Sequence, residues 1–126
     1  MGIFSSLMGN AGAVDRQKLE SEFSQLLCEN ETIEIGFKIF RDTFIFTTKR
    51  LILINKQGII GKKTEYLSVS YRSISRFSVE TAGTFDLEAE LKIWISSEQT
   101  PSISKRFDRS VNVYEVQQLL AQHVLK

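Results

Sequence analysis

The side chains best suited to nucleophilic chemistry in this chain are its single cysteine, Cys28, and its single histidine, His123. A catalytic thiol or hydroxyl needs an adjacent base, and that base needs a third group to orient it. No third group can be assigned beside these two residues, so Cys28 is interpreted as a buried structural thiol and His123 as a structural residue. The sequence also lacks a glycine-rich phosphate-binding loop. We therefore predict no enzyme activity, no catalytic residue and no cofactor.

Three carboxylates, Asp86, Glu88 and Glu90, recur at a spacing of two residues. In a strand this spacing places them on one face, with successive members about 7 Å apart. That separation is too wide for a calcium cage unless other strands add ligands, so no metal site is predicted. A solvated face is one preferred interpretation, and an acidic strip facing basic residues of a neighbour is the other. Trp94 ends the same face, either as a contact residue or packed under a helix.

Length and composition restrict the classes of protein that remain. The chain has 126 residues, 42% of them hydrophobic and 25% charged, and a formal net charge of +1. These values are typical of a single globular domain, and the balanced charge argues against nucleic acid as a partner. One cysteine, no secretory signal and no apolar run of about 20 residues indicate a cytoplasmic protein.

The elements that must position these side chains are mostly strands. Apolar residues at near-helical spacing predict an amphipathic helix over about residues 13–28, after a flexible apolar leader at 1–12. Between about 32 and 108, short alternating segments are separated by turns. Leu51–Ile54 is apolar on both faces, which predicts a strand covered on both sides. A closing helix is expected over about 112–125, with Asn112 as its N-cap and Glu115 completing a capping box.

Seven antiparallel strands followed by a helix predict a mainly β fold with flanking helices in one domain, residues 13–126. The expected plan is a pleckstrin-homology-like barrel of two near-orthogonal sheets, capped by the C-terminal helix.

Four blocks of sequence carry a family resemblance: RDTFIFTTKRLI at 41–52, QGIIGKK at 57–63, YRSI at 71–74 and ETAGTFDLEAEL at 80–91. Together they resemble the bacterial pleckstrin-homology-like domain family over about residues 31–126. The resemblance implies the barrel fold and self-assembly into closed cyclic rings, with five-fold symmetry as the expectation. It also implies a charged surface at protomer junctions that binds another protein. On this chain that surface would comprise Asp42, Lys49, Arg50, Lys62, Lys63, Arg72, Glu80, Thr84, Asp86, Glu88 and Glu90, to which we add Trp94.

Two functions from different classes follow. The first is a non-enzymatic protein-interaction module that forms a cyclic homo-oligomer and binds an unknown protein partner. The alternative is a peripheral binder of anionic lipid headgroups, using basic residues of the barrel such as Lys62 and Lys63. Membrane association is the less favoured hypothesis, because the loop at residues 41–43 places one arginine beside an aspartate and makes a poor phosphate clamp.

Overall fold

A computed structural model of the protein describes residues 13–14, 16–39, 42–57, 63–81, 88–108 and 111–125. The chain divides into two compact units, residues 1–69 and 70–126. The predicted leader at 1–12 lies outside the described residues. Among the helices that the structure describes, none is long and apolar enough to cross a membrane.

The first unit contains a five-stranded sheet with its strands in sequence order. Its elements are β1 (Ala13–Val14), α2 (Arg16–Phe23), the 3₁₀ turn η1 (Ser24–Leu26), β2 (Ile33–Ile39), β3 (Asp42–Thr47), β4 (Arg50–Gln57) and β5 (Lys63–Ser70). The N-terminal helix is shorter than the expected 13–28, because Ala13 and Val14 pair with the edge of β2 and the last turn tightens to 3₁₀.

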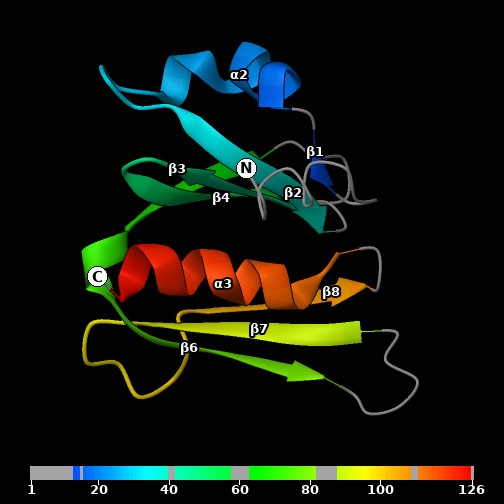
Figure 1. The fold of residues 1–126 in the computed structure, drawn as a ribbon, viewed down its shortest axis with the longest axis vertical. Coiled ribbons are helices and arrows are strands. Elements are labelled where there is room, and N and C mark those ends of the chain that lie inside the picture. The colour runs from blue at the N-terminus through cyan, green and yellow to red at the C-terminus, as the bar shows by residue number, and fades with distance from the viewer. Residues whose placement is uncertain are drawn as a thin grey trace. The chain divides into compact units, whose positions relative to one another are not determined.

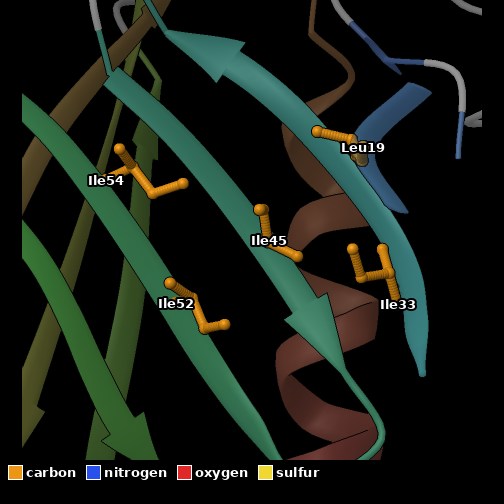
Figure 2. Packing of buried hydrophobic residues seen from close by; sticks show 5 residues of the cluster. All are labelled: Leu19, Ile33, Ile45, Ile52 and Ile54. Carbon is orange, nitrogen blue, oxygen red and sulfur yellow. The ribbon is translucent and has the colours of Figure 1, made fainter. Parts of the chain in front are cut away.

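Helix α2 covers one face of this sheet through a small apolar cluster (Figure 1). Gly36 on β2, Ile45 on β3 and Ile52 on β4 lie opposite one another across the strands. Leu19 of α2, only 1% exposed, packs with this row (Figure 2). A Cβ built on Gly36 would stand 2.4 Å from Leu19 Cδ1, so glycine is what permits this close approach.

The opposite face of the same strands carries aromatic side chains. Phe37 lies 6.3 Å from Phe44 and 5.8 Å from Phe46 between ring centroids, and all three are fully buried. Residues Leu51–Ile54 are buried without a break, which confirms the prediction that this strand is covered on both faces.

The second unit contains a three-stranded antiparallel sheet and the closing helix (Figure 1). Its elements are η2 (Tyr71–Ser73), β6 (Ile74–Thr81), β7 (Glu88–Ile95), β8 (Ile103–Asp108) and α3 (Val113–Val124). Asn112 caps α3 as predicted, since its Oδ1 accepts from Tyr114 N at 3.1 Å and its Nδ2 donates to Glu115 at 3.0 Å. Helix α3 packs against β6 and buries Val116, Leu119 and Leu120.

The predicted fold class is confirmed: the protein is mainly β, with the seven expected strands as β2–β8 in two antiparallel sheets and a helix toward each end. The interpretation of Cys28 is wrong, because this thiol is exposed. Helix α2 and η1 end before Cys28, so the residue lies outside the helix that was expected to extend to it.

Candidate interaction surface

One side of the β6–β7–β8 sheet is lined by polar and charged side chains and forms the best candidate for a functional surface. We call it the polar face; the register places Arg76, Ser78, Glu80, Glu90, Lys92, Trp94, Ser104 and Arg106 on it. The alternating positions Leu91, Ile93 and Phe107 are fully buried on the other side. Alternation of this kind lets one face of an antiparallel sheet pack on a core while the other face meets solvent or a partner.

Trp94 is held in a defined position on the polar face. The guanidinium carbon of Arg76 lies 4.6 Å from the centroid of the Trp94 ring, and Trp94 Nε1 donates to the carbonyl of Gln99 at 3.1 Å. Both ends of the indole are therefore restrained, one by a cation–π contact and one by a hydrogen bond. A half-buried tryptophan fixed in this way offers apolar contact area with little side-chain entropy left to lose on binding.

Charges of both signs lie on the polar face. Lys92 Nζ is 3.5 Å from Glu80 Oε1, while Glu90 Oε2 accepts from Ser104 Oγ at 2.7 Å. The Glu80 side chain is 64% exposed and that of Lys92 is 28% exposed. Pairs this exposed add little to folding stability, so these charges are available to meet complementary charges on another molecule.

The predicted surface residues do not all gather in one place. Glu80, Glu90 and Trp94 meet on the polar face, and the backbone of Glu88 continues it opposite Asp108. Arg72 is exposed on η2 of the same unit. The residues belonging to the first unit are Asp42, Lys49, Arg50 and Lys63, and those outside the described residues are Lys62, Thr84 and Asp86.

Arg50 is engaged within the first unit. Its Nε and Nη2 donate to Glu31 at 2.8 and 3.0 Å, and Nη1 donates to Ser68 Oγ at 2.8 Å. Glu31 also accepts from Thr47 Oγ1 at 2.6 Å and from the backbone N–H of Cys28 at 3.0 Å. We call Glu31, Thr47 and Arg50 the buried carboxylate cluster.

The Glu31 side chain is fully buried, and burial by itself would raise its pKa. The hydrogen bonds from Arg50, Thr47 and Cys28 outweigh that effect and lower the pKa of Glu31 from 4.5 to about 2. The cluster therefore ties β3 and β4 to the segment before β2, and its role is structural.

Sequence reasoning left five members of the polar face out of the predicted surface, the serines Ser78 and Ser104 and three charged residues, Arg76, Lys92 and Arg106. Period-two alternation in the sequence puts Arg76 on the same side of its strand as Glu80, and Lys92 on the same side as Glu90, but the predicted set comes mainly from the family-like blocks. Arg106 could be placed only by the β7–β8 register, which pairs it with Glu90. Among the described residues, no group of three or more His, Cys, Asp or Glu side chains is arranged to hold a metal ion.

This chain is similar in sequence to a known protein family. The family model for the bacterial PH domain matches residues 2–124. The uncharacterized Bacillus subtilis protein YjqA is 51% identical over 121 residues, which cover 96% of this chain and 97% of YjqA.

Two solved structures are also similar. A pleckstrin homology domain from Shewanella amazonensis superposes with a TM-score of 0.82 at 48% identity, covering 99% of this chain and all of the other. A pleckstrin-homology domain protein from Shewanella loihica gives a TM-score of 0.80 at 44% identity, covering 92% of this chain and 98% of the other. These findings confirm the predicted resemblance and the pleckstrin-homology-like fold.

Proposed function

The chain belongs to the bacterial PH domain family, and on that premise we propose that it is a non-enzymatic protein-interaction module that assembles with copies of itself into a closed cyclic ring. Five-fold symmetry is the expected ring size, and the cytoplasm is the expected compartment. The ring would present charged surface at its protomer junctions to a protein partner.

The polar face is the observation that carries this proposal. A ring is built from heterologous contacts, in which one surface of each protomer meets a different surface of the next. Charges of both signs on a rigid β-surface can fix the register of such a contact, because a wrongly aligned neighbour would bring like charges together. The restrained Trp94 supplies the aromatic anchor that strong interfaces commonly have at their centre.

The two candidate nucleophilic or basic side chains support a non-catalytic role. The ring of His123 stacks on that of Tyr71 at 4.2 Å between centroids, with only 7° between the planes. Cys28 is exposed beside the turn that supplies a backbone N–H to Glu31. The His123 ring therefore serves local structure in the second unit, and a binding module is the function that the PH fold suggests.

The proposal is tested by light scattering after size exclusion, at low and at high salt. We expect a discrete multiple of the 14.4 kDa chain mass at low salt. The diagnostic variant replaces three polar-face cations by glutamine: Arg76→Gln, Lys92→Gln and Arg106→Gln. Its control, Gln117→Glu with Gln118→Glu and Gln122→Glu, changes the net charge by the same amount on the exposed side of α3.

We expect the polar-face variant to run as a smaller species and the α3 control to keep the wild-type mass. A wild-type protein that stays monomeric at low salt overturns the ring. A ring that survives in both variants overturns the assignment of the polar face to assembly.

A further inference from the structure

A small hollow lies on the α2-covered face of the five-stranded sheet, within the first unit, and has a cavity volume of about 110 Å³. Its rim carries Lys18 and Glu22 from α2, Lys38 from β2, Lys56 from β4 and Tyr66 from β5. We call it the lysine hollow. It is separate from the polar face, which belongs to the other unit.

The hollow follows from the pairing register of the sheet. Leu19 covers the row formed by Gly36, Ile45 and Ile52. The neighbouring row on the same face is formed by Lys38, Thr43 and Ile54. Ile54 is 2% exposed and Thr43 is 6% exposed, so they form a floor beneath the longer side chains of the rim. Figure 2 shows Ile54 on β4 at the end of the apolar cluster away from Ile33.

The rim has an excess of positive charge. Three lysines stand against one glutamate, which leaves a formal excess of two positive charges around the hollow. Lys18, Lys38 and Lys56 are all exposed, and within the part of the chain that the structure describes none of them forms an ion pair. Three ammonium groups from three different elements around one hollow give it a positive local potential, which an acidic ligand would complement.

We propose that the lysine hollow docks an acidic segment of a protein partner, with one apolar side chain in the hollow and Asp or Glu residues on both sides of it. This rests on the proposed function as an interaction module and adds a second contact site to it. The partner's carboxylates would meet the lysines of the rim, while its apolar side chain would cover Ile54 and lie against Tyr66.

The size of the hollow favours a single side chain over a small-molecule ligand. Sites for small molecules commonly enclose about 300–1,000 Å³, whereas an engineered cavity of about 150 Å³ holds one benzene ring. The Tyr66 side chain adds an aromatic wall, and Tyr66 is 51% exposed. Exposed aromatic area next to a concave apolar floor is typical of an anchor pocket for a peptide side chain.

The test uses fluorescence anisotropy with a labelled peptide, Asp-Asp-Glu-Phe-Glu-Asp-Asp, and the full-length protein. We expect saturable binding that weakens at least tenfold when glycine replaces the phenylalanine, and that weakens again at high salt. A peptide with lysine in place of every acidic residue should not bind. If the acidic peptide fails to bind at low salt, or binds equally well without its phenylalanine, the inference is wrong.

Two substitutions on the same helix give a matched control. Lys18→Gln removes a charge from the rim, and Arg16→Gln removes one from an exposed residue of α2 that does not line the hollow. Loss of one surface ion pair corresponds to a weakening of up to about fivefold, expected for Lys18→Gln and for Lys38→Gln but not for Arg16→Gln. If Lys18→Gln and Arg16→Gln weaken binding equally, the peptide is attracted by the general charge of the protein, and the lysine hollow is not its binding site.

Further measurements on the same samples distinguish this inference from the ring proposal. If the protein forms a ring but does not bind the peptide, the inference about the lysine hollow is wrong and the proposed function stands. If the protein is a monomer that binds the peptide, the ring is overturned and the inference about the lysine hollow stands. A last measurement uses vesicles that contain phosphatidylserine. If the protein binds these vesicles but not the peptide, and Lys18→Gln abolishes the vesicle binding, then the lysines bind a lipid surface and the proposed protein partner is wrong.

Discussion

The two units of this protein use their charged residues in opposite ways. In the first unit, Arg50 reaches Glu31 at 2.8 Å, and the Glu31 side chain has no exposure to solvent. In the second unit, Lys92 reaches Glu80 only at 3.5 Å, and the glutamate side chain is 64% exposed. A buried, hydrogen-bonded pair holds its own unit together, whereas a long and exposed pair adds little to stability.

The sheets that carry these pairs differ in the same sense. The five-stranded sheet has α2 on one face and buried aromatic residues on the other, so its central strands are committed to the core. The three-stranded sheet commits one face to the core and leaves the polar face half-exposed. Charges in this small β protein therefore divide into those that specify the fold and those that remain for partners. The variants below test that division.

Breaking the two ion pairs should give the largest contrast. Arg50→Met leaves the buried Glu31 carboxylate without its cation, and we expect the free energy of unfolding to fall by about 3–5 kcal/mol. Lys92→Met removes the cation of the exposed pair by the same change of residue, and the expected loss is below about 1 kcal/mol. Urea unfolding at matched protein concentration measures both values. Similar losses in the two variants would contradict the division.

Acid should act on the first unit through Glu31. Its pKa is lowered from 4.5 to about 2, so its contribution to stability is complete above pH 4.5 and is lost as the pH falls toward 2. The shift corresponds to about 3 kcal/mol of stability over that interval. Urea unfolding between pH 2 and pH 7 should show this loss for the wild type, and a smaller loss for Glu31→Gln, which has no charge to protonate. Parallel curves for the two proteins would assign the acid sensitivity to other carboxylates.

The third test concerns the close approach of α2 to β2. Gly36→Ala places a methyl group where Leu19 Cδ1 lies, and overpacking of this kind costs about 1–3 kcal/mol. Leu19→Ala removes the obstructing group, so in that background the cost of Gly36→Ala should shrink. A double-mutant cycle of urea unfolding free energies measures the coupling. If the two substitutions are simply additive, the close contact does not limit packing at this position.

Much of this fold could be predicted from the sequence, because alternation of apolar residues reports a strand directly. The run at Leu51–Ile54 indicated a strand covered on both faces, and Asn112 with Glu115 marked the start of α3. The predicted helix at 13–28 is longer than the observed one, since the pairing of Ala13 with Phe37 depends on an edge of β2 that only the folded sheet creates. Local periodicity carries no information about such long-range pairing.

The candidate surface was less predictable for the same reason. A sequence shows that Arg50 is charged and near a strand, but not that Glu31 lies within hydrogen-bonding distance of it. Likewise, Arg76 and Trp94 are separated along the chain, and their contact follows from a register shifted by an irregularity after Ile74. The three lysines of the hollow come from three different elements, α2, β2 and β4, so no single stretch of sequence signals it.

The smallest effect on folding is expected at Arg76, where the effect on assembly should be large. Arg76→Gln removes a partly exposed cation–π contact worth about 0.5–1 kcal/mol, so the unfolding free energy should barely change.

Trp94 is the chain's only tryptophan, and its fluorescence therefore reports on the polar face alone. If the polar face is buried in a ring, acrylamide should quench Trp94 less as the protein concentration rises. Arg76→Gln should weaken that dependence, whereas Gln117→Glu on α3 should not. A quenching constant that stays the same across a concentration range in which light scattering shows monomers assembling would mean that the polar face stays open in the ring and is free to bind the partner.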